Sequence, residues 1–322
     1  MAVALIEQDL NDIEIAIEHH VELDKLGIPR KLLGMELTWT GPKRKQIKLT
    51  QKTSIENLEK EHGLQASNIP TKSLPLNPIL FEPPKEGEEV TPSQLQKYQS
   101  LVGSLLYINR CTRPEISIQV NLLGRRTSRA SHNNIQAAMH VLRYLASSKE
   151  KGVTIKQVPG GTKTPQEKGV IKAYADASYG GEQAKSQSGN MVTLSGQIVM
   201  WSSQRQDITA QSITEAEYIA CSEATKDIQW LQQLLEELPS QISAQPAYLY
   251  SDNEAAVKLT KTQTFHKRTR HIEHRYHYIR ELVEQGKIEL RGITGKDNPS
   301  DILTKILPMN SVKEWMTKQG LE

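Results

Sequence analysis

The sequence has few cysteines, few aromatic residues and no long apolar run. Its two cysteines, Cys111 and Cys221, are too few for a disulfide framework and match no zinc-binding spacing. We interpret both as small buried residues, a usage that fits a reducing intracellular compartment. No apolar run approaches the roughly 18–20 residues that a bilayer span needs, so no membrane partner is expected. The opening MAVALIEQDLND has too short an apolar run and no basic region for a signal peptide.

The charge is nearly balanced overall but uneven along the chain. The formal net charge is +3, from 40 Lys and Arg against 37 Asp and Glu. Between Lys258 and Arg291, nine basic residues and four histidines stand against four glutamates. This local excess predicts a polyanion partner on one face of the protein. The alternative is a solvated basic helix.

The length of 322 residues predicts two or three structural units. A loose apolar stripe over residues 9–25 predicts a helix. Residues 32–39 (LLGMELTW) and 46–50 (QIKLT) predict two strands joined by a turn at Gly41-Pro42. Five prolines and a run of glutamates between residues 65 and 90 predict a linker or an extended surface segment.

Helix-start signals mark four helices in the middle of the chain. Thr53 begins a capping-box pattern, and Thr91 combines such a pattern with a proline at the first helical position. Thr112 begins a similar start, and Asn133 or Asn134 begins the next. The last three helices carry basic residues that predict either the solvated rim of a helical bundle or a cradle for a phosphate backbone. These residues are Arg110, Arg113, Arg125, Arg126, Arg129, Arg143 and Lys151.

The second half of the chain alternates strands and helices. Three strands come first, then a long helix from Ser212 to about Leu238, a strand, two helices, a strand and a last short helix. Three linked strands followed by strands that alternate with helices predict an α/β fold with a mixed sheet and helices on its faces. The expected strands are residues 171–178, 188–196, 197–203, 246–251 and 287–293.

Acidic residues in this half lie on separate expected elements. Hydrolysis of a phosphodiester needs an activated water and relief of charge on the leaving oxygen, which two divalent ions about 3.5–4 Å apart provide. Such ions bind carboxylates, so we expect three or four of these acids to converge on a site that cuts nucleic acid. The candidates are Asp176 on the first strand, Glu215 and Glu217 early in the long helix, Asp252 after the fourth strand and Asp301 in the last helix.

Each acid also has an ordinary local explanation. Asp176 lies on the same side of its expected strand as several polar residues, so its side chain can face solvent. Glu215 follows Ser212 by three positions, as in a capping box. Asp252 and Asp301 stand near helix starts, where the positive end of a helix favours acids. The prediction therefore rests on the order of the whole set.

Four motifs around these acids resemble those of ribonuclease H domains. They are YADAS on the first strand, AEYIA in the long helix, YSDNEAA after the fourth strand and DNPSDIL in the last helix. Together with KRTRHIEHRYHYIRE they resemble the ribonuclease H region of copia-type LTR-retrotransposon polyproteins. Upstream, LGMELTW, YQSLVGSLLYINRCTRPEISIQVNLLGR and AAMHVLRYLASS resemble the end of the palm, the thumb and the connection of the same family's reverse transcriptase. The resemblance covers nearly all of the chain.

The resemblance implies a ribonuclease H-like fold, which is a five-stranded mixed sheet with flanking helices. The implied segments are a palm remnant at 1–64, a proline-rich linker at 65–90, a helical thumb and connection at 91–158, the ribonuclease H-like domain at 168–310 and a C-terminal tail at 311–322. An intracellular setting is expected, in the cytoplasm, the nucleus or a virus-like particle.

The resemblance also implies a ribonuclease that cleaves the RNA strand of an RNA–DNA hybrid. The AEYIA match selects Glu217 over Glu215. The implied catalytic residues and metal ligands are Asp176, Glu217, Asp252 and Asp301, which would hold two Mg²⁺ ions that Mn²⁺ can replace. The expected nucleic-acid contacts are Ser178, Asn253, Lys267, Arg268, Arg270 and Arg275.

Two departures from the family limit this expectation. The family's polymerase carries an Asp-Asp pair and this chain contains none, so we expect no DNA synthesis by this chain alone. The missing polymerase part is then a candidate partner. Many ribonucleases H have a mobile histidine before the last acid, whereas the loop GITGKDNPS offers only Lys296 to help a product leave. The alternative function is a non-catalytic, nucleic-acid-binding remnant of a truncated element.

Histidines and tryptophans offer weaker candidates. His271, His274 and His277 recur every third residue of an expected helix. Neither an HExxH pattern nor a Cys–His finger spacing is present, which favours nucleic-acid contact over zinc. Trp201 is a better candidate than Trp230 for stacking on a base, although both residues commonly pack in cores.

Overall fold

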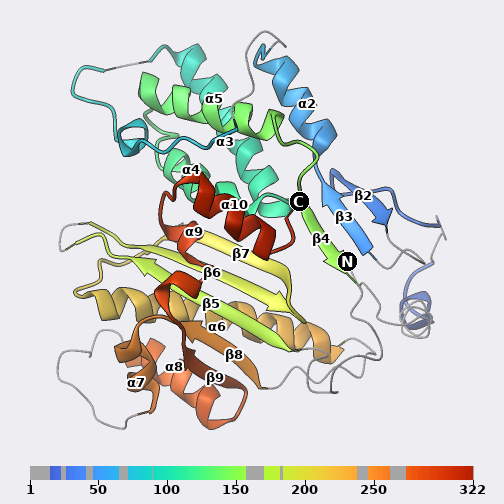
Figure 1. Cartoon of the computed structure of the whole chain (residues 1–322), viewed down its shortest axis with the longest axis vertical. Coiled ribbons are helices and arrows are strands. Elements are labelled where there is room, and N and C mark those ends of the chain that lie inside the picture. Colours follow the sequence, from blue (N-terminus) through green and yellow to red (C-terminus); the bar gives the residue numbers. More distant parts are fainter. Residues whose placement is uncertain are drawn as a thin grey trace.

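The computed structural model (Figure 1) describes residues 15–22, 27–40, 46–64, 72–88, 90–156, 170–181, 184–237, 246–261 and 273–321, with the backbone alone at 258–261 and 273–277. It contains two β-sheets, and a group of helices lies above the larger sheet in Figure 1. None of the described helices is both long enough and apolar enough to cross a membrane.

The smaller sheet is antiparallel and joins distant segments of the chain. Its strands, in spatial order, are β1 (Lys31–Leu32), β2 (Met35–Thr40), β3 (Gln46–Thr50) and β4 (Val153–Lys156). The expected hairpin of β2 and β3 is confirmed, with Leu37 opposite Leu49, while its turn at Gly41-Pro42 lies outside the described residues. Of the helix expected at 9–25, residues 15–18 are helical and the described remainder is not.

The helices between β3 and β4 form one packed group, called the helical unit below. The capping box of Thr91 with Gln94 is confirmed. The capping box at Thr53 is wrong, because α2 has already begun at the preceding residue without a side-chain cap. The start of α5 is set by Ser131, whose hydroxyl accepts the Asn134 N–H while the Asn134 side chain accepts the Ser131 N–H. The helices are α2 (Lys52–Glu61), α3 (Pro92–Cys111), α4 (Ser117–Gly124) and α5 (His132–Ala146), with short 3-10 helices η2 (Pro78–Phe81) and η3 (Pro114–Ile116).

The described part of the proline-rich segment, residues 72–88, lies against the helical unit. Phe81 in this segment is buried. Asn134 of α5 donates hydrogen bonds from Nδ2 to the carbonyl oxygens of Leu80 and Glu82, at 2.9 and 3.0 Å. The described part of the segment therefore contains the short helix η2 and is tied to α5 through its backbone.

The larger sheet is mixed and has five strands, in the spatial order β7-β6-β5-β8-β9. Its first three strands along the chain, β5, β6 and β7, pair antiparallel, whereas β5 pairs with β8 and β8 with β9 in parallel. This confirms the expected α/β fold with a five-stranded mixed sheet and flanking helices. The strands are β5 (Ile171–Ser178), β6 (Gln187–Leu194), β7 (Gln197–Arg205), β8 (Ala247–Ser251) and β9 (Ile288–Gly292). The helices that follow them are α6 (Ile213–Glu237), α7 (Glu254–Lys261), α8 (Glu273–Glu284), η6 (Gly295–Asp297), α9 (Asp301–Thr304) and α10 (Met309–Lys318).

The two faces of this sheet have different coverings. Alternate residues of a strand point to opposite faces. Ala173, Ala175 and Ala177 of β5 pack with residues of α6 in one buried cluster. The side chains between them, including Asp176, face the other side, where Thr304 of α9 contacts that carboxylate. The small alanines let the long helix α6 lie close to β5, and the opposite face is left for polar groups.

A single core connects the helical unit with the end of the chain. Buried side chains of α3, α4 and α5 share one cluster with Leu303 of α9 and Trp315 of α10. Figure 1 shows α10 between the helical unit and the large sheet. The segment 311–322, expected to be a tail, therefore contributes a docked helix. Trp201 packs against the same core and donates from Nε1 to the Asn109 carbonyl at 2.9 Å, whereas Trp230 is 56% exposed.

Candidate active site

Four elements bring the predicted acids to one end of the large sheet. Tyr174 of β5 is the register partner of Tyr250 of β8 in a parallel pair. Asp176 and Asp252 each stand two residues further on, so the parallel pairing sets them side by side. Glu217 lies in the first turns of α6, beside the same strand end.

Three of the four acids lie within metal-binding distance of one another. One carboxylate oxygen from each of Asp176, Glu217 and Asp252 lies within 4.8 Å of the others. Asp176 is 0% exposed and Glu217 is 5% exposed, while Asp252 is half-buried. Glu215 is not in this group. Its N–H donates to Ser212 Oγ at 3.1 Å and its Oε2 accepts the Gln211 N–H at 2.7 Å, which is the expected capping role.

Asp301, the fourth predicted acid, is joined to the group through a lysine. Lys305 Nζ lies 2.5 Å from Asp301 Oδ1 and 3.5 Å from Asp176 Oδ2. Lys305 is the residue that follows α9, four positions after Asp301, and its ammonium group reaches back to the Asp301 carboxylate. The structure thus places Asp301 beside the three clustered acids, with the ammonium group between it and Asp176.

The electrostatics of the cluster are those of a desolvated set of like charges. Burial raises the pKa of Asp176 to about 6, although hydrogen bonding to Thr304 and the charge of Lys305 oppose the rise. Burial, with further repulsion from Asp176 and Asp252, raises the pKa of Glu217 to about 8. Asp176 Oδ1 and Glu217 Oε2 are buried, and neither has a hydrogen-bond partner among the described residues. Unpartnered buried carboxylate oxygens in a like-charged group fit a hard divalent cation such as Mg²⁺.

Short helix α9 is fixed to β5 by two polar side chains before it. Asn298 Nδ2 donates to the Ala175 carbonyl at 2.9 Å, and Ser300 Oγ donates to the Tyr174 carbonyl at 2.7 Å. These bonds place Asp301, the first residue of α9, at the end of β5. The sequence NPSD indicated only an ordinary helix start, so this anchoring was missed.

Two glycines allow the close approaches around the acids. A Cβ added at Gly189 of β6 would lie 2.7 Å from both Leu303 Cβ and Thr304 Cγ2. A Cβ at Gly295 would lie 3.1 Å from Asp252 Oδ2. Larger residues at these positions would displace α9 or the Asp252 carboxylate.

The structure also shows site residues that the sequence did not single out. The Thr304 hydroxyl donates to Asp176 Oδ2, and the Ala177 backbone N–H donates to Glu217. Lys305 had a sequence signal, its position four residues after Asp301 in SDILTK. Thr304 had no such signal, because it lies more than a hundred residues from Asp176 in the chain.

The predicted nucleic-acid contacts are only partly described. Ser178 ends β5, two residues beyond Asp176 and half-buried. Asn253 Oδ1 accepts the Ala256 N–H at 2.9 Å and so caps α7. The backbone of Arg275 lies in α8, but its side chain is outside the described residues. Lys267, Arg268, Arg270 and His271 lie wholly outside the described residues, and only the backbone of His274 and His277, in α8, is described.

The prediction that Arg113 belongs to a phosphate cradle is wrong. Arg113 is 1% exposed and forms an ion pair with Glu115 at 2.6 Å, beneath the ring of Tyr144. A buried, paired guanidinium is part of the core of the helical unit and does not reach a phosphate.

Comparison with known proteins identifies related polyproteins. No protein-family model matches the chain. The retrovirus-related Pol polyprotein from transposon TNT 1-94 of Nicotiana tabacum is 32% identical over 299 residues, covering 90% of this chain and 21% of that protein. The Pol polyprotein from transposon RE1 of Arabidopsis thaliana is 30% identical over 302 residues, covering 85% and 20%. The chain thus spans about a fifth of the length of these relatives.

Two solved structures match more weakly. One is the N-terminal RNase H domain of a Mycobacterium tuberculosis protein fused to maltose-binding protein, with 16% identity, a TM-score of 0.33 and coverage of 46% of this chain and 96% of that chain. The other is LC11-RNase H1 in complex with RNA/DNA hybrid, with 17% identity, a TM-score of 0.33 and coverage of 41% and 92%. On these sequence matches, the chain is homologous, over most of its own length, to a part of the retrovirus-related Pol polyproteins of plant transposons.

Proposed function

We propose that this chain is a ribonuclease that hydrolyses the RNA strand of an RNA–DNA hybrid. The observation that carries the proposal is the convergence of Asp176, Glu217 and Asp252 from three separate elements to within 4.8 Å. Asp301 completes the site from α9. The segment 168–310 would form the nuclease domain, and residues 91–158 would correspond to the thumb and connection of the polymerase that precedes it in the relatives.

The four acids would hold two magnesium ions, for which manganese can substitute. Bound ions of this kind supply an activated water and stabilise the charge that develops on the leaving oxygen. The buried oxygens Asp176 Oδ1 and Glu217 Oε2 are the most favourable ligands, since neither has another partner among the described residues.

The chain's own residues hold the acids in place for this chemistry. Thr304 donates to Asp176 Oδ2 and so leaves Oδ1 directed elsewhere. Ala177 donates its N–H to Glu217. Lys305 offsets part of the negative charge and lies where a phosphate oxygen of the substrate would approach. Preorganised groups of this kind need little rearrangement during the reaction.

Selection of an RNA strand would depend on contacts with 2′-hydroxyl groups, which distinguish RNA from DNA. Ser178 lies two residues beyond Asp176 on the same sheet face. Asn253 is next to Asp252, with its Oδ1 engaged in capping and its amide nitrogen left to donate. Basic residues between 267 and 275 would contact the phosphate backbone.

The proposal is tested on the purified chain with three labelled duplexes and one labelled single strand. We expect a 5′-labelled RNA paired with DNA to be cut in Mg²⁺, leaving a 3′-hydroxyl. RNA–RNA, DNA–DNA and single-stranded RNA of the same sequence should stay intact, and EDTA should stop the reaction. Expression in a host without its own ribonuclease H removes the main contaminant. Binding of the hybrid without cleavage in Mg²⁺ or Mn²⁺ would instead support the non-catalytic remnant.

A further inference from the structure

A group of arginines lies on the same sheet face as Asp176, at the junction with the helical unit. The register of the antiparallel strands aligns Ser178, Gln187 and Arg205 in one row across β5, β6 and β7. The neighbouring row on this face contains Asp176 and the two residues opposite it. Register partners project to one face of a sheet. The side chain of Arg205 therefore emerges on the face that carries the acids.

One further arginine, Arg125, reaches this row from the end of α4, and a second, Arg126, follows it in the chain. The Arg125 guanidinium donates to Asn121 Oδ1 at 2.9 Å and also to Gln187 Oε1, beside Arg205. Arg126 follows it and donates from Nε to the Phe81 carbonyl at 3.0 Å. The three guanidinium groups thus come from two parts of the chain that the fold brings together.

These arginines lack carboxylate partners. Arg113, Lys149 and Arg291 each form an ion pair with a glutamate. Within the part of the chain that the structure describes, Arg125, Arg126 and Arg205 form no ion pair, and the Arg205 guanidinium donates no hydrogen bond. Burial, together with the charges of Arg205 and Arg126, lowers the pKa of Arg125 to about 10. An anion bound between such like charges relieves their repulsion and gains charge-assisted hydrogen bonds.

Hydrogen bonds fix this arginine group relative to the acids. Gln187 Nε2 donates to Ser203 Oγ at 2.8 Å, and Ser203 Oγ donates to the Leu303 carbonyl of α9 at 2.6 Å. Asn121 Nδ2 of α4 donates to the Ser203 carbonyl at 2.8 Å. The same strand therefore holds both α4, next to the arginines, and α9, which carries Asp301.

The spacing suits a nucleic-acid backbone. Two strand separations of about 4.8 Å and two residues at about 3.3 Å each put the backbones of Arg205 and Asp176 roughly 12 Å apart. A duplex strand carries one phosphate per about 3.4 Å of helix axis. A strand placed at the acids therefore brings further phosphates within reach of the arginines.

We propose that Arg125, Arg126 and Arg205 form a phosphate-binding site for the backbone of the duplex that is cut at Asp176. The inference rests on the proposed function, since it takes a nucleic-acid duplex as the substrate. The junction of α4 with β7, outside the acid cluster, then helps to hold that duplex. The competing explanation is structural, in which Arg125 fastens α4 to β6 and Arg205 is only solvated.

The test measures binding of a fluorescein-labelled RNA–DNA hybrid to the Glu217→Gln protein, which should bind without cutting. Arg205→Gln and Arg126→Gln are added separately to this background, and Arg125 is left intact because it holds α4. Each should weaken binding about tenfold, the effect of removing one charge-assisted hydrogen bond. The slope of log affinity against log salt should also fall by roughly 0.9 for each phosphate that the variant no longer neutralises.

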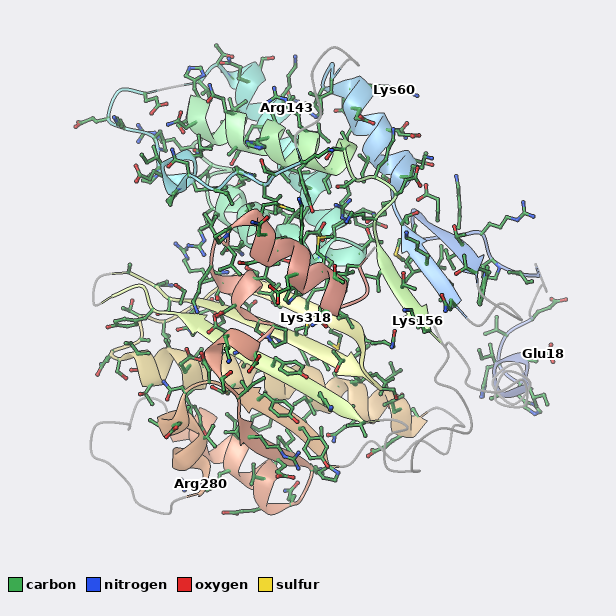
Figure 2. All side chains as sticks on the ribbon, in the orientation of Figure 1. Glu18, Lys60, Arg143, Lys156, Arg280 and Lys318 are labelled. Carbon is green, nitrogen blue, oxygen red and sulfur yellow. The ribbon has the colours of Figure 1, made fainter. Side chains whose placement is uncertain are left out.

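Lys60→Gln is the control. Lys60 is exposed on α2, at the far side of the helical unit from the sheet (Figure 2), and its replacement should change neither affinity nor slope. Melting temperatures confirm that each variant is folded. Parental affinity and slope in both arginine variants would overturn the inference, even if the wild-type chain cuts the hybrid. Arginine-dependent binding in a chain that never cuts would support it and remove the catalytic proposal.

Discussion

At the scale of single residues, Asp176 presents its two carboxylate oxygens to different surroundings. Oδ2 accepts a hydrogen bond from Thr304 and lies 3.5 Å from Lys305 Nζ. Oδ1 is buried and has no partner among the described residues. One oxygen is thus held by the protein, and the other is available to a cation. Lys305 offsets charge that burial would otherwise make unfavourable.

Replacement of Lys305 tests this compensation. In EDTA, Lys305→Met should lower the free energy of unfolding by about 1 kcal/mol, a small value because the ammonium is partly exposed. In Mg²⁺ the difference in unfolding free energy between the variant and the wild type should shrink, since ions bound at the acids stabilise the folded state. Thermal melts with EDTA and with Mg²⁺ measure both effects. The exposed Lys313→Met variant on α10 is the control, and identical melting of the two variants in EDTA would contradict this role of Lys305.

Asp227 on α6 gives a pH dependence away from the acid site. Burial, with Glu223 nearby, raises its pKa from 3.8 to about 6, although Asn190 donates to it. The folded state therefore binds more protons than the unfolded state between about pH 4 and 6, so stability falls as pH rises through that window. Asp227→Asn keeps an acceptor for Asn190 and removes the charge. It should stabilise the protein at pH 7.5 by about 1–2 kcal/mol.

Urea unfolding at pH 4.5 and pH 7.5 checks the Asp227 prediction. The gain from Asp227→Asn should be small at the lower pH, where the wild-type carboxyl is already protonated in the folded state. Glu237→Gln, at an exposed position on the same helix, should change little at either pH. An equal gain at both pH values would show that packing, not charge, explains the effect.

The sequence predicted the acids better than it predicted their surroundings. Asp176 and Glu217 were identifiable because each lies within a short local motif. Thr304 and the buried pair of Arg113 with Glu115 were not, because their roles depend on which segments the fold brings together. Arg113 shows the limit most clearly, since nothing local distinguishes a buried arginine from an exposed one.

At the scale of elements, α9 is too short to hold itself in place. A helix of four residues has almost no intrinsic stability. Its position depends on Asn298 and Ser300, which bond to β5, and on Gly189, which leaves room for it on β6. The placement of Asp301 is therefore set by its neighbours in the fold.

Gly189→Ala should displace α9. The added Cβ would lie 2.7 Å from Leu303 Cβ and Thr304 Cγ2, so we expect a loss of about 1–3 kcal/mol in stability. Cleavage should fall on the order of 10- to 100-fold, because Asp301 and Thr304 move. Gly103→Ala on α3 is the matched control, since its Cβ would meet nothing within 4 Å and should leave cleavage unchanged. Normal cleavage by Gly189→Ala would refute the role of this contact.

Element order was predictable, but element starts were predicted unevenly. The strand alternation and the hairpin of β2 with β3 followed from periodicity, which reflects one buried face. The cap at Thr91 held because Pro92 reinforces it, whereas Thr53 already lies inside α2. A capping pattern shows which residues are able to cap a helix. It does not determine the residue at which the helix begins in the folded protein.

At the scale of the whole molecule, the end of the chain connects the two halves. Trp315 of α10 is 8% exposed and packs in the core shared with α3, α4 and α5. Its Nε1 donates to the Pro299 carbonyl at 2.7 Å, just before the segment that carries Asp301. The large sheet and the helical unit are therefore parts of one packed structure.

Trp315→Ala should destabilise the whole chain. Removal of a large buried side chain costs about 3–5 kcal/mol, and both the helical unit and the sheet should unfold together at a lower urea concentration. Fluorescence and circular dichroism both follow the unfolding and should give coincident curves. Trp230→Ala, at a position 56% exposed, should change stability by less than about 1 kcal/mol. Separate transitions for the two halves in the wild type would argue against a shared core.

This long-range packing is the part that the sequence could not provide. The segment 311–322 shows an amphipathic pattern, but periodicity does not say which distant helices will cover it. The return of β4 to β3 and the contact of α4 with β7 have the same origin. Each depends on a pairing between segments far apart in the chain, and no local signal encodes such a pairing.

The most direct test of the central claim is the single-turnover rate of hybrid cleavage in Mg²⁺ for the wild type and for Asp252→Asn. The substitution keeps the shape of a half-buried side chain and removes its charge from the acid cluster. Because the carboxylates would supply several kcal/mol through bound ions, we predict a rate at least about 100-fold lower with unchanged hybrid affinity. Equal rates for the two proteins would contradict the assignment of a nuclease site to these acids.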